Sequence, residues 1–155
     1  MTRPPPRGRT NSAPGPGPGR LRLIGGTYRS RLLPIPDHEG LRPTPDRVRE
    51  TLFNWLQPLL PGALCLDCFA GSGALGLEAA SRGAEEVVML ERAAPVVRQL
   101  RANVQALGAD RVQVLGTDAL VWLADPGRPF DLIFLDPPYA AGLLVPACDL
   151  IARNG

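Results

Sequence analysis

Apolar runs and amphipathic stretches alternate along the second half of the chain. Between residues 61 and 155, short apolar runs predict buried strands, and stretches with apolar residues three or four positions apart predict helices. The predicted strands span residues 63–67, 87–90, 112–115 and 130–135, and the predicted helices span 74–81, 95–107 and 120–123. Such alternation is typical of an α/β domain, with a mainly parallel sheet, right-handed crossovers and helices on both faces.

The first 60 residues follow a different pattern. Two short alternating runs flank Gly25-Gly26, which predicts a β-hairpin within residues 21–33. A helix is predicted from Pro45, with Thr44 as its N-cap. Its apolar stripe is predicted to comprise Val48, Leu52, Trp55 and Leu56, leaving Arg42, Arg47 and Arg49 outside it. We therefore divide the chain into a disordered Pro-, Gly- and Arg-rich tail (1–20), a hairpin and helix (21–60) and the α/β domain (61–155).

The last predicted strand ends abruptly at Asp136-Pro137-Pro138-Tyr139. Neither proline can donate a hydrogen bond to a sheet, so the strand is expected to end at about Asp136. A carboxylate, free carbonyl groups and an aromatic ring are then left together at the carboxyl end of a strand, where open α/β sheets bind their ligands. These four residues are the candidate catalytic group.

A glycine-rich turn follows the first strand of the domain. Gly71-Ser72-Gly73-Ala74-Leu75-Gly76 matches the dinucleotide fingerprint G-x-G-x-x-G, and Glu91 lies 20 residues after Gly71. A nicotinamide-dependent oxidoreductase is therefore one interpretation. Asp67 argues against it, because a carboxylate aimed into the turn would repel a pyrophosphate and attract a cationic amine. S-adenosylmethionine carries such an amine and no phosphate.

Three acids close successive predicted strands above this turn. Asp67 is assigned to the amine of the donor, Glu91 to the two ribose hydroxyls, and Asp118 to the adenine amino group. The alternative is that each acid only caps a helix, which suits Asp118 well. The candidate cofactor-binding residues are Asp67, Phe69, Ala70, Gly71, Ser72, Gly73, Glu91, Asp118 and Ala119.

Charge is distributed unevenly along the chain. All 17 basic residues are arginine; residues 1–60 hold 10 of them against 4 acids (+6), and residues 61–155 hold 7 against 11 acids (−4). A basic front segment suits phosphates, although a solvated strand face is the plain alternative. Arg22, Arg29 and Arg31 are expected to share one hairpin face. The candidate RNA-binding residues are Arg22, Arg29, Arg31, Arg42, Thr44 and Arg47.

The three cysteines do not predict a disulfide framework or a metal site. Cys65 and Cys68 form a C-x-x-C on a predicted strand, where positions three apart face opposite ways. The sequence contains neither the apolar stretch of a signal peptide nor a run of about 18 apolar residues that could span a membrane. We therefore expect a cytoplasmic protein with reduced thiols, no metal and no membrane partner.

Several of these segments resemble one enzyme family. From about Leu21 onward, the chain is similar to the bacterial small-subunit ribosomal RNA guanine-N2 methyltransferases of the RsmD type. The resemblance is carried by residues 22–26, 42–56, 67–73 and 136–139. Asp-Pro-Pro-Tyr alone is shared with other amino-methylating enzymes, whereas residues 42–56 single out this family.

The resemblance implies a Rossmann-like class I methyltransferase that uses S-adenosylmethionine and releases S-adenosylhomocysteine. Its implied substrate is one guanine of 16S rRNA in an assembled or assembling small subunit, and the enzyme is expected to act as a monomer. The family's fold normally continues with three more strands after the position of Gly155. We therefore expect the sheet to lack its last strands and residues 130–135 to form an apolar edge.

Other functions remain open at this level. A DNA adenine-N6 methyltransferase would use the same Asp-Pro-Pro-Tyr element, and a nicotinamide enzyme would use the glycine turn. A fragment that keeps the basic hairpin could bind RNA without catalysis.

Overall fold

The computed structural model describes residues 19–38, 41, 44–138 and 142–154. Residues 1–18 of the predicted tail, together with Arg42 and Tyr139, lie outside the described residues.

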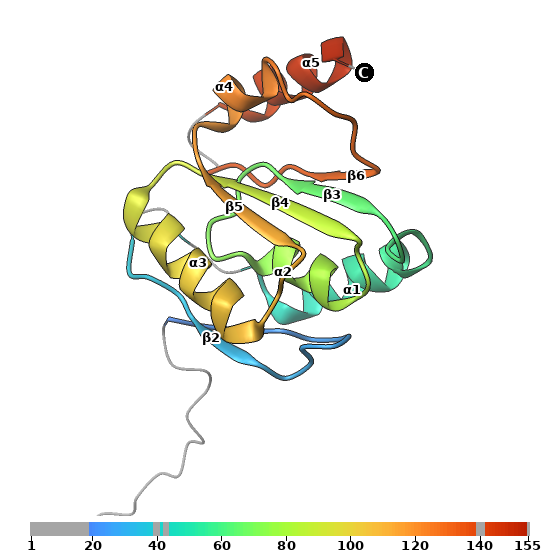
Figure 1. Cartoon of the computed structure of the whole chain (residues 1–155), viewed down its shortest axis with the longest axis vertical. Helices are drawn as coiled ribbons and strands as arrows, with labels where there is room; N and C mark the ends of the chain where they lie inside the picture. Colours follow the sequence, from blue (N-terminus) through green and yellow to red (C-terminus); the bar gives the residue numbers. More distant parts are fainter. Residues whose placement is uncertain (1–18, 39–40, 42–43, 139–141, 155) are drawn as a thin grey trace, which may run out of the picture.

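A parallel four-stranded sheet forms the centre of the molecule (Figure 1). Its strands are β3 (Leu64–Asp67), β4 (Glu86–Glu91), β5 (Val112–Gly116) and β6 (Leu132–Phe134). Their order is β5-β4-β3-β6, so the chain moves outward from β3 to β5 and then returns to the other side of β3. This reversal between β3 and β6 is the place where open α/β sheets form a ligand crevice at their carboxyl ends. Among the described residues β6 lies at one edge of the sheet.

Helices cover both faces of the sheet, as predicted (Figure 1). On one face lie α1 (Asp46–Leu56), α2 (Ala74–Ser81) and α3 (Ala94–Leu107), with the short 3-10 helix η1 (Gln57–Leu59) after α1. On the other face lie α4 (Ala119–Leu123) and α5 (Leu144–Asn154). The apolar side chains accordingly form two separate cores, one on each side of the sheet.

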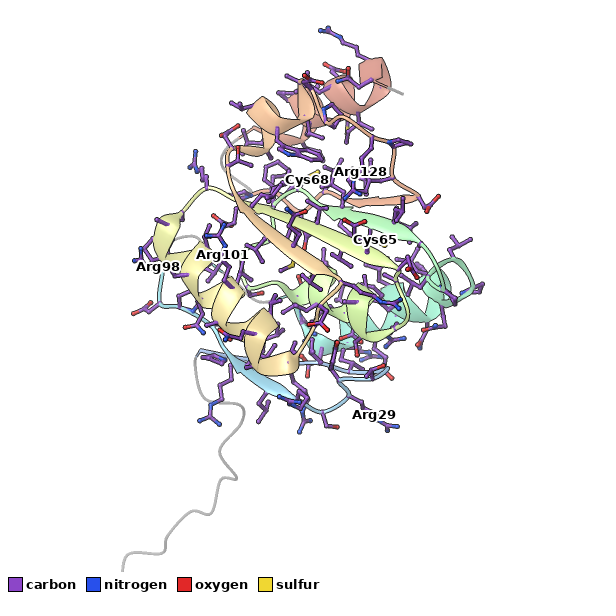
Figure 2. All side chains as sticks on the ribbon, viewed as in Figure 1. Arg29, Cys65, Cys68, Arg98, Arg101 and Arg128 are labelled. Atoms are coloured by element: carbon purple, nitrogen blue, oxygen red, sulfur yellow. The ribbon has the colours of Figure 1, made fainter. Side chains whose placement is uncertain are left out.

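The two cysteines of the C-x-x-C belong to different cores. Cys65 packs with the residues under α1, α2 and α3, whereas Cys68 packs with those under α4 and α5 (Figure 2). The prediction that the two thiols face opposite ways is therefore confirmed. Among the described residues, no group of three or more His, Cys, Asp or Glu side chains is arranged to hold a metal ion.

The hairpin is present, but its turn is not at Gly25-Gly26. Its strands are β1 (Arg20–Arg22) and β2 (Leu32–Pro34), and the nine residues between them form a long loop that packs against the end of α2. The Thr27 amide donates to the Ser81 carbonyl (2.8 Å) and the Tyr28 amide donates to Ser81 Oγ (3.0 Å). Gly26 has φ +77°, and a Cβ there would lie 1.8 Å from the Ser81 carbonyl oxygen. The two glycines thus permit a close approach to α2 rather than a two-residue turn.

Helix α1 presents a different face to the core than its sequence predicted. Val48 and Trp55 are 55% and 75% exposed, whereas Arg49 and Phe53 are 1% and 0% exposed. The Phe53 ring packs against that of Phe134, with 5.7 Å between ring centroids, and this contact sets the rotation of the helix. The prediction for Leu52 and Leu56 holds, since both are partly buried against the same core.

The start of α1 also differs from the prediction. Pro45 occupies the N-cap position, without a side-chain hydrogen bond, and the first helical residue is Asp46. Thr44 is therefore not the N-cap, and its hydroxyl is directed elsewhere. None of the helices in the described part of the chain combines the length and the apolar character needed to cross a bilayer.

Candidate active site

The carboxyl ends of the four strands bring the candidate acids to one edge of the sheet. Asp67, at the end of β3, pairs with Met89 of β4 on one side and with Phe134 of β6 on the other. Glu91 lies two residues beyond Met89, and Asp136 lies two residues beyond Phe134. Because the strands are parallel, all these acids project from the same edge.

Asp67 is the most deeply buried of these acids, with 1% of its side chain exposed. Its Oδ2 accepts a hydrogen bond from the Gly76 amide at 3.0 Å. Its other oxygen, Oδ1, is buried and is the one buried side-chain polar atom in the described part of the chain that lacks a hydrogen-bond partner. Burial raises the pKa of Asp67 to about 7, against the lowering effect of the backbone amides of Gly76 and Phe69, and the charges of Asp136 and Glu91 raise it further. Such an oxygen is suited to accept from a cationic group.

The glycine turn follows Asp67 in the chain and leads into α2. Gly71 and Gly73 have φ +52° and +85°, a conformation that other residues rarely adopt. A Cβ at Gly73 would lie 2.8 Å from the side chain of Leu100 and 2.9 Å from that of Leu77. The turn is therefore closed tightly onto α2 and α3. Of the other candidates in it, Ala70 and Ser72 are both 6% exposed and Phe69 is partly buried.

Glu91 links the end of β4 to the same turn. Its Oε2 accepts from the Gly71 amide (3.1 Å) and its Oε1 accepts from the Ala93 amide (3.0 Å). These bonds fix the carboxylate beside the turn, and a carboxylate has room for further donors such as hydroxyl groups. Its assignment to a ribose stays a prediction.

Asp118 acts as a helix cap, as the simpler interpretation held. Its Oδ1 accepts from the amides of Leu120 (2.9 Å) and Val121 (3.2 Å) at the start of α4. Ala119, the next residue, is 6% exposed. A role for these two residues beside an adenine ring stays a prediction.

The structure gives Asp136 a partner from the front of the chain. Asp136 is exposed, Pro137 is partly buried and Pro138 is exposed. The Thr44 hydroxyl donates to Asp136 Oδ2 at 3.4 Å. Thr44, which the sequence assigned to RNA binding and to helix capping, thus lies beside the candidate catalytic residue Asp136.

The predicted row of hairpin arginines does not form. Arg22 lies on β1, but Arg29 lies in the loop and projects away from the body of the molecule (Figure 2). Arg31 precedes β2 and donates to the Ala106 carbonyl at the end of α3 (3.2 Å). The residue that shares the outward face of β1 with Arg22 is Arg20, because Leu21 between them is buried. Arg47 is exposed on α1.

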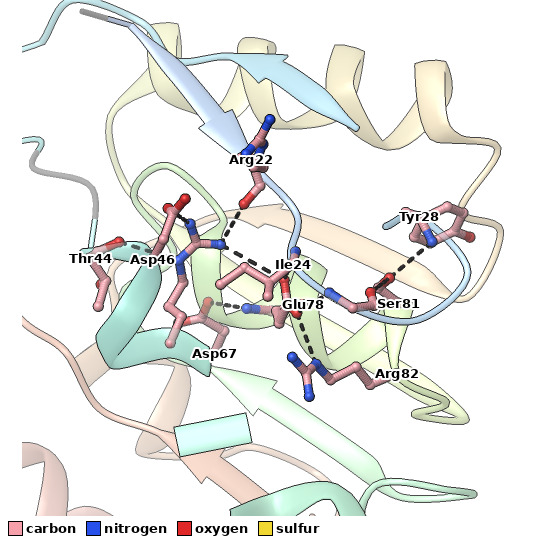
Figure 3. Close-up of polar contacts among 12 residues, drawn as sticks. Arg22, Ile24, Tyr28, Thr44, Asp46, Asp67, Glu78, Ser81 and Arg82 are labelled. Carbon is pink, nitrogen blue, oxygen red and sulfur yellow. Dashed lines mark hydrogen bonds and ion pairs between the residues drawn. The ribbon is translucent and has the colours of Figure 1, made fainter. Parts of the chain in front are cut away.

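A buried charged cluster, missed by the sequence analysis, connects the hairpin and α1 to α2 (Figure 3). Glu78 of α2 is 0% exposed and accepts from the amides of Ile24 (3.0 Å) and Gly25 (2.9 Å) and from Nε of Arg82 (2.8 Å). Arg49, predicted to lie on the outside of α1, contributes the second cation, with 3.8 Å between its Nη1 and Glu78 Oε2. A signal was available, since Glu78 is the sole charged residue of the apolar helix α2.

Comparisons with known proteins place this geometry in a family. The family model described as "Conserved hypothetical protein 95" matches residues 21–155. The chain is 51% identical over 139 residues to ribosomal RNA small subunit methyltransferase D of Escherichia coli, covering 90% of this chain and 70% of that protein. The chain belongs to this family. The enzyme of the same name from Haemophilus influenzae is 46% identical over 140 residues, covering 88% of this chain and 72% of that protein.

Solved structures give the same answer for the fold. The structure of a candidate methyltransferase from Escherichia coli superimposes with a TM-score of 0.81 at 47% identity, covering 88% of this chain and 74% of that one. The α/β methyltransferase fold predicted for the family is therefore confirmed. The chain spans about 70% of the length of the relatives named above.

Proposed function

We propose that this protein transfers the methyl group of S-adenosylmethionine to the exocyclic N2 amine of one guanine in 16S rRNA. The observation that carries the proposal is the pairing of β3 with β6, which places Asp67 and Asp136 together where the strand order reverses. One acid is then available to a cationic donor and the other to an amine acceptor. The names of the relatives, ribosomal RNA small subunit methyltransferase D, support ribosomal RNA as the substrate.

The residues around the glycine turn fit S-adenosylmethionine. The unpartnered Oδ1 of Asp67 is suited to its ammonium group, and the tight backbone at Gly71 and Gly73 allows close contact. Glu91 would accept from the ribose hydroxyls, and Asp118 with Ala119 would face the adenine. When bound, S-adenosylmethionine supplies an electrophilic methyl group on a sulfonium and leaves as neutral S-adenosylhomocysteine. A pyrophosphate would meet the buried carboxylate instead, which disfavours a nicotinamide cofactor.

The acceptor side prepares a poor nucleophile. The lone pair of an exocyclic amine is delocalised into its base. The Asp136 carboxylate and the Pro137 carbonyl would accept hydrogen bonds from the two N–H groups of the amine. These bonds localise the lone pair and orient it for attack on the methyl group. Tyr139 would stack on a base swung out of its helix, and Pro138 would keep this segment extended. The protein contributes mainly positioning and electrostatics.

Residues 21–60 would supply the contacts to RNA. Arg22, Arg29, Arg42 and Arg47 are the candidates among them, and Arg31 retains free N–H groups beside its bond to α3. We expect the substrate to be an assembled or assembling small subunit, in the cytoplasm, and the enzyme to act as a monomer.

The direct test supplies labelled S-adenosylmethionine and small subunits that lack base methylation. The expected product is N2-methylguanine in 16S rRNA. Asp136→Ala is expected to abolish turnover while leaving donor binding largely intact, and Asp110→Ala, at the opposite end of the sheet before β5, is the control. Full activity of Asp136→Ala would refute the catalytic assignment.

The same assay separates the alternatives. Label in the adenines of duplex DNA would indicate an adenine-N6 methyltransferase, and subunit binding without label would indicate a non-catalytic RNA-binding protein. Binding of a nicotinamide dinucleotide in preference to S-adenosylmethionine would favour an oxidoreductase.

A further inference from the structure

The hydroxyl of Thr44 is directed at the candidate catalytic carboxylate rather than at its own helix. Threonine just before a helix commonly caps it, but α1 has Pro45 at the N-cap and no side-chain cap bond. The Thr44 hydroxyl instead donates to Asp136 Oδ2 at 3.4 Å, across 92 residues of sequence.

The backbone of Thr44 is held in place by a buried arginine. Arg49, one turn into α1, donates from Nε to the Thr44 carbonyl at 3.2 Å. Its other nitrogens donate to Asp46 Oδ1 (2.6 Å) and to the Arg22 carbonyl (2.8 Å). With 1% of its side chain exposed, Arg49 has little freedom to move. Thr44 is therefore presented to Asp136 from an anchored position.

Asp136 needs such an anchor. It is exposed and precedes two prolines, which cannot donate hydrogen bonds to a sheet, so the sheet does not hold its side chain. It also lies close enough to Asp67 for the two negative charges to interact. Like charges favour rotation of the exposed carboxylate away from the buried one.

We propose that Thr44 is a positioning residue for Asp136, holding Oδ2 so that Oδ1 faces the amine of the acceptor base. The inference rests on the proposed function, and it gives Thr44 a role in the chemical step rather than in RNA affinity. Arg49 fixes the backbone of Thr44, and the Thr44 hydroxyl in turn fixes the carboxylate of Asp136.

Two substitutions separate the hydroxyl from the shape of the side chain. Thr44→Val keeps the shape and removes the donor, and Thr44→Ser keeps the donor. The matched control is Thr51→Val, since the Thr51 hydroxyl is exposed and bonds only within α1, to the Arg47 carbonyl. We expect kcat to fall about 10- to 100-fold in Thr44→Val, the range for loss of a hydrogen bond to a charged group, with the KM values for donor and subunit unchanged. Thr44→Ser is expected to stay within about threefold of wild type, like Thr51→Val.

The kinetic outcomes that overturn the proposal are distinct. Thr44→Val with wild-type kcat would overturn it, as would an equal loss in Thr44→Ser. A raised KM for the subunit at unchanged kcat would mean that Thr44 contacts RNA instead.

A second readout does not depend on turnover. In protein labelled with ¹³C at aspartate carboxyl groups, the Asp136 signal is expected to shift in Thr44→Val and to stay near its wild-type position in Thr44→Ser. Equal positions in wild type and Thr44→Val would overturn the contact itself. If the variants show these signal shifts but the wild-type protein transfers no methyl group, the proposed function is refuted and the contact between Thr44 and Asp136 remains established.

Discussion

Arg49 of α1 and Glu78 of α2 form an ion pair that solvent hardly reaches. Their side chains are 1% and 0% exposed, and 3.8 Å separates Arg49 Nη1 from Glu78 Oε2. Glu78 also pairs with Arg82 at 2.8 Å and accepts the amides of Ile24 and Gly25. One carboxylate therefore binds α1, the hairpin loop and the end of its own helix together.

Glu78→Gln is expected to destabilise the fold by about 3 kcal/mol. The change removes the negative charge and leaves the buried Arg82 guanidinium without its counter-ion, while Arg49 keeps only its contact with Asp46. Removing one partner of a buried pair is the costly way to break it. Urea unfolding of the variant and the wild type measures the difference. Glu85→Gln is the control, because its pair with Arg111 is largely exposed and should contribute little. Equal effects of the two substitutions would show that the Glu78 cluster does not hold the fold.

This cluster also shows what the sequence could not reveal. The pattern of apolar and charged residues placed Arg49 on the solvent-facing side of α1 and Trp55 on its core-facing side. The actual rotation of the helix depends on two contacts distant in sequence, Phe53 with Phe134 and Arg49 with Glu78. Hydrophobic periodicity predicts that a helix exists, but it does not identify the distant residue that pairs with a buried charge.

Gly26→Ala is expected to destabilise the protein far more than Gly62→Ala. The two glycines have nearly the same φ, +77° and +76°, so the backbone strain introduced by alanine is similar, about 1 kcal/mol. A Cβ at Gly26 would additionally lie 1.8 Å from the Ser81 carbonyl oxygen, whereas one at Gly62 would meet nothing within 4 Å. We expect Gly26→Ala to lose about 2 kcal/mol or more of unfolding free energy beyond the loss in Gly62→Ala. Unfolding curves of the two variants and the wild type measure this difference. Similar losses in both variants would mean that the loop does not need its close contact with α2.

Cys148 is expected to be the one cysteine that reacts readily with a thiol reagent in the folded protein. Burial raises the pKa of Cys65 to about 11 and that of Cys68 to about 12, so neither is a thiolate near neutral pH, and both are covered. Cys148 is exposed. Titration with a chromogenic disulfide should show one fast thiol in the native state and three after denaturation. Cys148→Ser should remove the fast phase, and a fast phase that persists in this variant would contradict the assignment.

The site was more predictable than the surface that surrounds it. Strand ends and the glycine turn follow from local pattern, and parallel pairing then brings Asp67, Glu91 and Asp136 to one edge without further information. The contact between Thr44 and Asp136 joins segments 92 residues apart, and no local pattern encodes it. The loop of the hairpin was misplaced for a similar reason, since its shape is set by Ser81 and Glu78 of α2.

Asp67 is expected to make the stability of the fold depend on pH. Its pKa is raised from 3.8 to about 7 in the folded protein, chiefly by burial. Between these values the unfolded chain has lost the proton that the folded protein still holds, so stability falls as pH rises through this interval and levels off above about pH 7. Asp67→Asn cannot ionise. As pH rises from about 4 to about 7, the free energy of unfolding of Asp67→Asn should increase relative to that of the wild type. A difference between the two proteins that is constant with pH would contradict the assignment.

Binding of S-adenosylmethionine is expected to show the opposite trend with pH. The ionised form of Asp67 is the one that attracts the ammonium group, so donor affinity should fall as pH drops below about 7, where the buried carboxyl takes up a proton. Calorimetric titration at about pH 6 and about pH 8 measures the change, and proton release on binding below pH 7 accompanies it. In Asp67→Asn, affinity should be weak and nearly independent of pH. Wild-type affinity in that variant would show that the unpartnered Oδ1 of Asp67 does not bind the donor.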